Sequence, residues 1–296
     1  MFGYLPSVAI QSVMLVSDSN SNFISTSTLR TIMHYCKHVS RISFGKALDD
    51  AEALPLNNST TDDKLLKRSK SLRHQFFQAF EQLQDLKELY FNDFNFSYNL
   101  TDSFHQYLRT NQTIESIEFN GTIFQDSNLI FESLKNHQKI QNITFNQCQF
   151  DRNFDFMAFL SISSTLSSLK SVTIIQNFTT VQYYKIFSTL LKSKNVESLS
   201  IRLKNNELPN LYSVLTSFMK QNTSLKSLTI LSYEFQELQL YGIFDALQVQ
   251  NTVTHFQFVD EHLRDESKAN LQSFLELQED GQCTLQSLSG TYYSNR

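Results

Sequence analysis

Apolar and polar residues follow one short pattern that returns along the chain at a nearly constant interval. In residues 86–91, Leu-Lys-Glu-Leu-Tyr-Phe, the first, fourth and sixth side chains are apolar. The pattern returns at residues 114–119, 140–145, 169–174, 196–201, 225–230 and 253–258. Successive side chains of a β-strand point to opposite faces, so the fourth and sixth residues of each copy share one face. Each copy therefore predicts a short strand with one buried face.

Three weaker copies extend the array toward both ends of the chain. Their apolar positions hold Ile10, Val13 and Leu15, then Val39, Ile42 and Phe44, and finally Leu285 and Leu288. Gly290 replaces the third apolar residue in the last of these copies. The seven clear copies begin 26 to 29 residues apart. A fixed period of this size predicts a repeat protein, in which neighbouring units stack to bury a continuous core.

The segments between the predicted strands carry a helical pattern. Ten residues before the first apolar residue of each strand, from the second strand onward, lie Leu29, Phe76, Phe104, Ile130, Phe159, Ile186, Leu215, Ile243 and Leu275. Six residues before it, seven of the nine positions are also apolar, and the exceptions are Ser163 and Glu279. Residues four apart share one face of an α-helix. Each unit is therefore predicted to be a strand, a turn and an amphipathic helix.

This combination of strand pattern, period and helix resembles the leucine-rich repeat proteins, and among them the ribonuclease-inhibitor-like subclass, over residues 8–290. The resemblance implies an α/β fold, a leucine-rich repeat solenoid of about ten β-α units. Such a horseshoe has a concave parallel sheet and convex helices. Because a solenoid grows by stacking, residues 1–296 are expected to form a single domain.

The turn after each strand is predicted to vary between repeats. Cys148 and Asn177 lie three residues after the last apolar residue of their strands, where the family that this chain resembles carries Cys or Asn. In that family these side chains bond backbone groups of the turn. Other copies carry Phe94, Thr122, Lys204, Tyr233 and Glu261 at this position. Cys148 leaves a second subclass open, the cysteine-containing repeats of F-box-type proteins.

One interval is longer than the others, because 47 residues separate Val39 from Leu86. The excess lies at residues 45–63, where Pro55 and a polar Asn-Ser-Thr run predict a loop insertion. Two interpretations of this insertion remain open, a tolerated surface loop and a binding element. The helix predicted after it is basic and includes Lys67, Arg68 and Lys70. Either a solvated helix face or a contact for an acidic partner explains this charge.

The third and fifth residues of each strand point away from the apolar face and are expected to line the exposed sheet. Most of them are Ser or Thr, which suit a solvated sheet without any partner. The early copies differ, because Arg41, Glu88, Tyr90 and Glu118 occupy such positions and Glu115 is expected near them. Tyr and Arg are enriched at binding hot spots. We therefore expect a protein contact at these five residues.

Composition and motifs exclude several classes of function. The chain carries 25 Lys and Arg against 29 Asp and Glu, a balance that does not favour nucleic acid as a partner. No apolar run reaches the roughly 18–20 residues of a membrane span. His34, Cys36 and His38 are spaced like metal ligands, but no second pair completes a four-ligand site. Phosphate-loop, metalloprotease and nucleophile-elbow motifs are absent from the sequence, so neither a cofactor nor an enzyme activity is predicted.

Cysteine and asparagine usage bears on the compartment. The three cysteines, Cys36, Cys148 and Cys283, are odd in number and far apart, which favours a reducing, cytoplasmic setting. Glycosylation sequons nevertheless occur at Asn58, Asn99, Asn111, Asn120, Asn142, Asn177 and Asn222. An extracellular receptor fragment therefore remains open as an alternative.

The resemblance implies a non-enzymatic scaffold that binds protein partners, or a subunit of a larger multi-protein complex. Cytoskeletal or axonemal assemblies and ubiquitin ligases are examples of such complexes. A different class also remains open, a regulator of an enzyme that is either nuclease inhibitor-like or GTPase-activator-like. Repeat arrays usually present an extended surface to a partner, and the period alone does not select among these partners.

Overall fold

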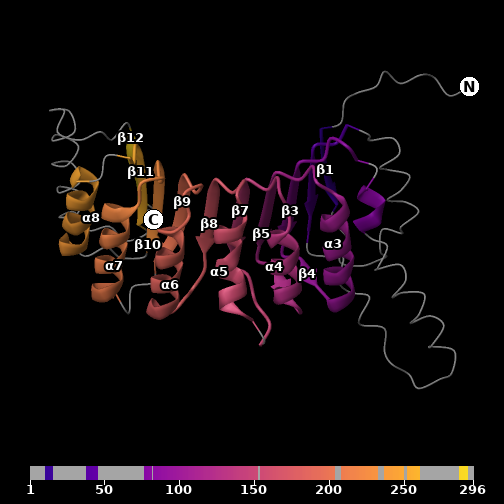
Figure 1. The fold of residues 1–296 in the computed structure, drawn as a ribbon, viewed down its shortest axis with the longest axis horizontal. Helices are drawn as coiled ribbons and strands as arrows, with labels where there is room; N and C mark the ends of the chain where they lie inside the picture. The colour runs from indigo at the N-terminus through magenta and orange to yellow at the C-terminus, as the bar shows by residue number, and fades with distance from the viewer. Residues whose placement is uncertain are drawn as a thin grey trace, which may run out of the picture. The chain divides into compact units, whose positions relative to one another are not determined.

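The computed structural model describes residues 11–15, 38–45, 77–81, 83–152, 154–203, 208–232, 237–249, 252–260 and 287–292. A strand lies at each of the ten predicted positions (Figure 1). The strands are Ser12–Leu15 (β1), Arg41–Phe44 (β2), Glu88–Asn92 (β3), Ser116–Asn120 (β5), Asn142–Asn146 (β7), Ser171–Ile175 (β8), Ser198–Leu203 (β9), Ser227–Ser232 (β10), His255–Asp260 (β11) and Ser287–Tyr292 (β12). Within the described ranges these ten strands form a parallel sheet in the order β1-β2-β3-β5-β7-β8-β9-β10-β11-β12. The predicted α/β solenoid is confirmed.

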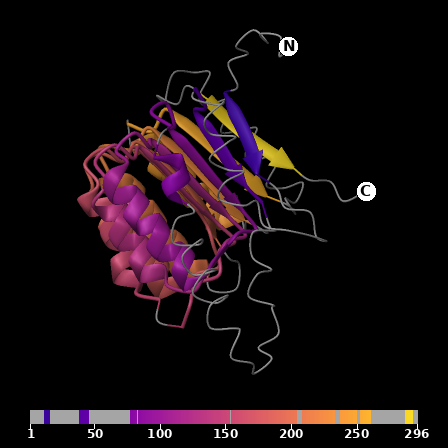
Figure 2. The ribbon, with the colours of Figure 1, turned by 90° about the vertical axis from the view of Figure 1, so that its right-hand side faces the viewer.

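Among the described residues, helices follow the strands where the helical register predicts them. They are the 3-10 helix Phe77–Phe80 (η3) and the α-helices Tyr98–Thr110 (α3), Ser127–Lys135 (α4), Phe156–Thr165 (α5), Thr180–Leu190 (α6), Leu208–Gln221 (α7) and Glu237–Val249 (α8). The register residues are buried wherever their burial is described, such as Phe104 and Leu108 in α3. The helices lie on one face of the sheet, and this face is the buried one (Figure 2).

The chain forms two compact units. The first comprises Met1–Asn142 and Asn146–Phe159, and the second comprises Ile143–Phe145 and Leu160–Arg296. Their cores differ in chemistry. Phe dominates the buried strand and turn positions of the first unit, whereas Leu, Ile and Val dominate those of the second. The single domain expected over residues 1–296 stays a prediction.

Aromatic rings at equivalent repeat positions stack on one another in the first unit. Phe91 lies between Phe44, at 4.9 Å, and Phe119, at 5.3 Å between ring centroids, and the rings are nearly parallel. A second column places Phe124 beside Phe96, at 5.6 Å. The spacing between neighbouring strands, about 4.8 Å, is close to the spacing that stacked rings adopt. Repetition of Phe at one position therefore produces a continuous stack inside the unit.

A left-handed turn follows each of the strands β3, β5 and β7. Asp93, Gly121 and Gln147 stand at the same repeat position and have φ angles of 48°, 58° and 50°. A Cβ atom on Gly121 would lie 2.3 Å from the Asp93 carboxylate, so only Gly fits there without a shift of that side chain. The N–H of Asp93 donates to Asn120 O at 2.7 Å, and that of Gly121 donates to Asn146 O at 2.8 Å. The turns at Asp93 and Gly121 are thus each bonded to the next repeat.

Beyond this turn the repeats pair a second time. Asn95–Phe96 (β4) pairs in parallel with Ile123–Phe124 (β6), a two-residue ladder too short to leave a sequence pattern. Thr122 and Cys148, which share one repeat position, bond backwards to the preceding strands. The Thr122 hydroxyl donates to Phe91 O at 3.1 Å, and the Cys148 thiol donates to Phe119 O at 3.3 Å. The turn function expected of Cys148 is therefore confirmed.

Asn177, at the same position as Cys148, does not follow the expectation. Its side chain is exposed, while the preceding residue, Gln176, is buried. The chain after β8 therefore differs by one residue from the turns of the first unit, and the side chain at the inward position changes accordingly. The interpretation of Asn177 as a buried turn residue is wrong for this repeat.

A polar residue fills the corner that leads from each of three helices into the next strand. Asn111, His137 and Asn222 each stand three residues before a strand's first apolar residue, and all three are buried. Asn111 Oδ1 accepts the N–H of Thr113 at 2.8 Å, and Asn222 Oδ1 accepts that of Leu225 at 2.7 Å. Because backbone groups without partners are costly inside a protein, these side chains stabilise the corner. Asn111 and Asn222 are therefore not open to glycosylation in the folded chain.

His137 also joins two repeats. Its Nδ1 accepts the N–H of Lys139 at 3.3 Å, so the ring proton lies on Nε2, which donates to Asn111 O at 3.0 Å. Burial disfavours the imidazolium and lowers the pKa of His137 to about 4. The ring is therefore neutral in the folded protein at neutral pH.

We expect Phe91→Ala to lower the free energy of unfolding by about 3–5 kcal/mol, because it removes the middle ring of a fully buried stack. Urea unfolding followed by circular dichroism measures the change. Tyr98→Ala, at an exposed site on α3, serves as the control and should change stability by less than about 0.5 kcal/mol. Equal unfolding midpoints for the two variants would contradict the stacked core.

We expect His137 to make stability fall as the pH decreases from about 6.5 to about 4. In this range His137 binds a proton in the unfolded chain but stays neutral in the folded one. Protonation therefore favours the unfolded state, and the stability present above pH 6.5 is lost toward pH 4. The difference between the two pKa values corresponds to at most about 3 kcal/mol. Urea unfolding across this range, compared with His137→Gln, isolates the contribution. If the free energy of unfolding depends on pH in the same way in the wild type and in His137→Gln, the predicted contribution of His137 is wrong.

Candidate protein-binding site

The five sheet residues expected at a contact lie at the start of the repeat array. Arg41 is on β2, Glu88 and Tyr90 are on β3, Glu118 is on β5, and Glu115 directly precedes β5. The other predicted site residues, Lys67, Arg68 and Lys70, lie outside the described residues, as do residues 46–63 of the insertion and the pair His34 and Cys36. The described part of the site therefore consists of four strand residues and one residue that precedes a strand; Arg41 is exposed, and the other four are half-buried.

Strand register brings Arg41, Glu88 and Tyr90 together. Arg41 pairs with Glu88 across β2 and β3. The Arg41 Nε donates to Glu88 Oε2 at 2.6 Å, and the Tyr90 hydroxyl donates to the same oxygen at 2.9 Å. The Arg41 guanidinium carbon also lies 5.2 Å from the centroid of the Tyr90 ring, within the range of a cation–π contact. Three side chains from two strands thus hold one another in place.

A row of polar side chains continues from this group. Tyr90 pairs in register with Glu118 on β5, and Asn92 pairs with Asn120. The Asn120 amide donates to Glu118 Oε1 and also to Asn92 Oδ1, the latter at 3.0 Å. The Asn92 amide then donates to Ser43 Oγ at 2.9 Å. These two bonded groups adjoin where Tyr90 and Glu118 pair in register. We call them together the sheet-face cluster, which comprises Arg41, Ser43, Glu88, Tyr90, Asn92, Glu118 and Asn120.

Sequence reasoning missed three members of the sheet-face cluster, Ser43, Asn92 and Asn120. One signal was available, because Asn follows the last apolar residue in three consecutive copies, at Asn92, Asn120 and Asn146. An amide both donates and accepts, so equivalent Asn residues on neighbouring strands can bond in a chain. The repetition of Asn predicts such a chain only once the register between the strands is known.

Electrostatics fix the charge states at the centre of the cluster. The hydrogen bond to Glu88 raises the pKa of Arg41. Partial burial raises the pKa of Glu88, but the bonds from Arg41 and Tyr90 outweigh it, so the pKa of that carboxyl is lowered overall. Burial, followed by the bond to the Glu88 carboxylate, raises the pKa of Tyr90. At neutral pH the group is therefore a guanidinium, a carboxylate and a neutral phenol.

Glu115 lies apart from the cluster, although its sequence position suggested otherwise. Its Oε1 is 2.9 Å from Lys87 Nζ, the residue at the same repeat position on the neighbouring strand. The second unit repeats this arrangement, where Lys226 Nζ is 2.7 Å from Glu197 Oε2. Both pairs are exposed, and such pairs contribute little to stability. Glu115 therefore belongs to a row of surface ion pairs at the beginning of the strands.

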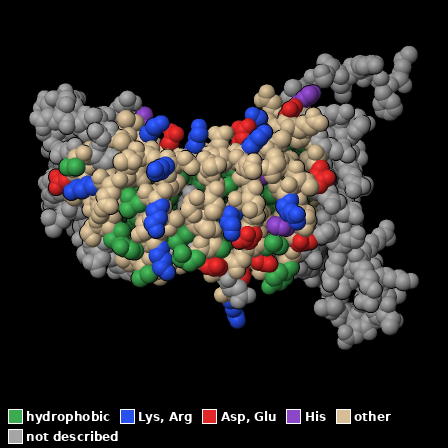
Figure 3. Space-filling view, in the orientation of Figure 1, with side chains coloured by type: hydrophobic (Ala, Val, Ile, Leu, Met, Phe, Trp, Pro, Cys, Tyr) green, Lys and Arg blue, Asp and Glu red, His purple; other side chains and the backbone are tan. Residues whose placement is uncertain are grey.

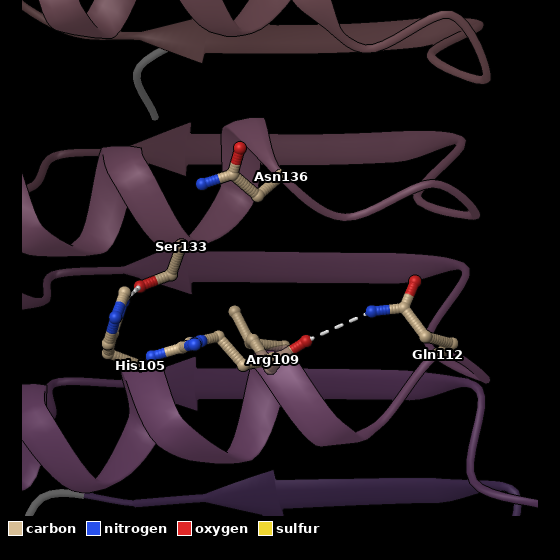
Figure 4. A pocket seen from close by; sticks show the side chains of 6 residues that line it. His105, Arg109, Gln112, Ser133 and Asn136 are labelled. Atoms are coloured by element: carbon tan, nitrogen blue, oxygen red, sulfur yellow. Dashed lines mark hydrogen bonds between the residues drawn. The ribbon is translucent and has the colours of Figure 1, made fainter.

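A groove of about 450 Å³ opens on the helix side, between α3 and α4 (Figure 4). It is lined by His105, Leu108, Arg109, Gln112, Ser133 and Asn136. The Ser133 hydroxyl donates to Leu129 O at 2.6 Å, and its oxygen also lies 2.7 Å from Nδ1 of His105. The hydrogen bond between Ser133 and His105 joins two neighbouring helices.

Two further classes of site were searched for in the described part of the chain. Among those residues, no group of three or more His, Cys, Asp or Glu side chains is placed to hold a metal ion. None of the described helices has the length and apolar character needed to cross a membrane. Basic and acidic side chains are interspersed on the face shown in Figure 3.

Comparisons with known proteins bear on the fold. No family model matches the sequence, and no curated protein matches it. Among solved structures, the leucine-rich repeat-containing protein LegL7 from Legionella pneumophila is similar over 94% of this chain and 81% of its own, with 17% identity and a TM-score of 0.55. An internalin, InlF, from Listeria monocytogenes covers 98% of this chain and 88% of its own at 11% identity, but its TM-score is 0.37. The likeness to LegL7 shows a leucine-rich repeat-like solenoid and extends to the fold alone.

We expect Tyr90→Phe to raise the pKa of Glu88, because one of the two donors to its carboxylate is lost while the ring remains. The pKa of Glu88 is lowered in the folded protein, so the stabilisation is present above the ordinary pKa of 4.5 and is lost as the pH falls below it. NMR titration of the Glu88 carboxyl carbon measures the change. Tyr98→Phe, on the helix side, is the control. An unchanged pKa of Glu88 in the Tyr90→Phe variant would contradict the hydrogen bond from the Tyr90 hydroxyl to Glu88.

Proposed function

We propose that this chain is a non-enzymatic, cytoplasmic scaffold that binds a protein partner through the sheet-face cluster. The observation that carries the proposal is the network in which Arg41, Glu88 and Tyr90 hold one another on the strand face that points away from the apolar core. Arg and Tyr supply much of the binding energy at protein interfaces. Side chains that are ordered before binding lose less conformational entropy when the partner arrives. The cluster is therefore preorganised for a contact.

The chemistry of the site supports a binding role over an enzymatic one. Glu88 is already paired with Arg41, and its lowered pKa makes it a poor general base at neutral pH. On the helix side, the Ser133 hydroxyl donates to Leu129 O, the carbonyl one turn earlier in its own helix. The proposal accordingly includes no cofactor, no metal and no nucleic acid.

The subclass and the assembly belong to the proposal as well. Helices of 13 and 14 residues in α3 and α7 support the ribonuclease-inhibitor-like subclass, whose outer elements are long. Thr122 occupies the same position and makes the same kind of bond as Cys148, so cysteine itself is not required there. This weighs against the cysteine-containing subclass. A place in a cytoskeletal, axonemal or ubiquitin-ligase assembly is consistent with a scaffold.

Two alternatives are weaker. Burial of Asn111 and Asn222 removes two of the sequons on which an extracellular receptor fragment depended. A nuclease inhibitor-like or GTPase-activator-like regulator would also bind a protein, but no described side chain points to such an enzyme. The scaffold is therefore the proposal that the sheet-face cluster supports best.

The test begins with capture of the partner by the full chain from its own cells and identification of the captured protein by mass spectrometry. Direct binding of the purified partner is then measured by calorimetry. We expect the double substitution Arg41→Ala and Tyr90→Ala to weaken binding by roughly 30-fold or more, as loss of a hot spot does. Thr229→Ala, on the exposed face of β10 in the second unit, is the matched control and should bind as the wild type does.

Equal affinity of the double variant and the wild type would place the contact elsewhere and overturn the proposal. Circular dichroism melting of each variant separates a lost contact from a lost fold. Because all three substituted residues are on strand faces away from the apolar core, the variants are expected to fold.

A further inference from the structure

Three carboxylates at the start of the array differ in how their charge is balanced. Glu88 is bonded to Arg41, and Glu115 is bonded to Lys87. Glu118 is bonded to the neutral amide of Asn120 and forms no ion pair within the described part of the chain. Glu118 therefore has no ion-pair partner among the described residues, although its charge contributes to the raised pKa of Arg41.

The position of Glu118 keeps its carboxylate close to Tyr90 but away from Arg41. It is half-buried on the exposed face of β5, directly beside Tyr90 in the strand register. Arg41 is two strands away, roughly 10 Å at the usual strand spacing, and its Nε is committed to Glu88. The bond from Asn120 holds the Glu118 side chain in one orientation and engages Oε1. Among the described residues no donor engages Oε2, so this oxygen can accept from a donor outside the cluster.

We propose that the sheet-face cluster recognises a basic segment of the partner protein, in which an arginine side chain bonds the Glu118 carboxylate. The inference rests on the proposed function and adds the chemistry of the partner. Charge complementarity selects a cation, because the cluster holds two carboxylates and one guanidinium. Arginine fits better than lysine, since its planar fork of donors bonds a carboxylate with defined geometry and packs against a tyrosine ring.

The first experiment uses the full isotope-labelled chain and two probes. One is the peptide acetyl-Gly-Gly-Arg-Gly-Gly-amide, and the other replaces arginine by citrulline, which has nearly the same shape but no charge. We expect the arginine peptide to shift the NMR signals of the Asn120 side-chain amide, which is bonded to Glu118. The citrulline peptide should bind at least ~10-fold more weakly, because a charge-assisted bond is lost.

Two variants with the same change of charge complete the test. Glu118→Gln keeps an acceptor for Asn120 and should weaken binding of the arginine peptide by ~10-fold. Glu132→Gln, on α4, removes a carboxylate from the helix side of the same unit and should leave binding within about twofold, since distant surface charges are screened. Equal binding of both peptides, or unchanged binding to Glu118→Gln, would overturn the inference. Unfolding midpoints equal to that of the wild type show that both variants are folded.

Failure of this inference differs from failure of the scaffold. If the purified partner loses affinity for the Arg41→Ala, Tyr90→Ala variant but not for Glu118→Gln, the scaffold stands and the arginine contact is wrong. If the partner binds the double variant as tightly as the wild type, while the arginine peptide still requires Glu118, the proposed partner contact is wrong and the cation site stands. Full support requires that Glu118→Gln weakens binding of both the arginine peptide and the purified partner.

Discussion

Neighbouring strands of the first unit pair residue for residue at equivalent repeat positions, so Leu89 lies beside Ile42 on one side and Ile117 on the other. This register decides what every other group can contact. On the buried face it places Phe91 between two rings. On the exposed face it places Glu88 beside Arg41, and Tyr90 beside Glu118. A shift of one residue would exchange the two faces and remove the core and the cluster together.

The same register sets different demands on the two faces. Inside, identical side chains at one position are favourable, because rings or branched chains stack at the strand spacing. Outside, identical charges at one position would repel each other directly across the strands. The chain avoids this repulsion by placing unlike or neutral side chains next to each other. One row across the strands holds Arg41, Glu88 and Ser116, and another places Lys87 beside Glu115. Polar variety on the exposed face is thus required by the regularity of the buried face.

Strand and helix positions followed from the sequence because they depend on local periodicity. Phe104 and Leu108, four residues apart, mark α3 without knowledge of any other repeat. The inward side of each strand was predictable for the same reason. The candidate residues Arg41, Glu88 and Tyr90 were brought together as a group, although their bonds were not foreseen.

Contacts between repeats escaped prediction because they join residues far apart in the chain. The bond from Asn92 to Ser43 spans 49 positions, and the bond from His137 to Asn111 spans 26. Small changes in the turns also matter, as the inward residue moves from the position of Cys148 to that of Gln176. Glu115 was grouped with Tyr90 by nearness in sequence, yet its register partner is Lys87. Turn geometry and register, which no local pattern encodes, decide these cases.

The left-handed turns at Asp93 and Gly121 have a consequence for the evolution of the chain. Each of these two turns donates its N–H to the backbone of the repeat that follows it, from the same repeat position. Because only backbone atoms are involved, a duplication of one unit between them would allow the same bond to form at the new junction. A break inside a strand would instead disturb the register on which these bonds depend.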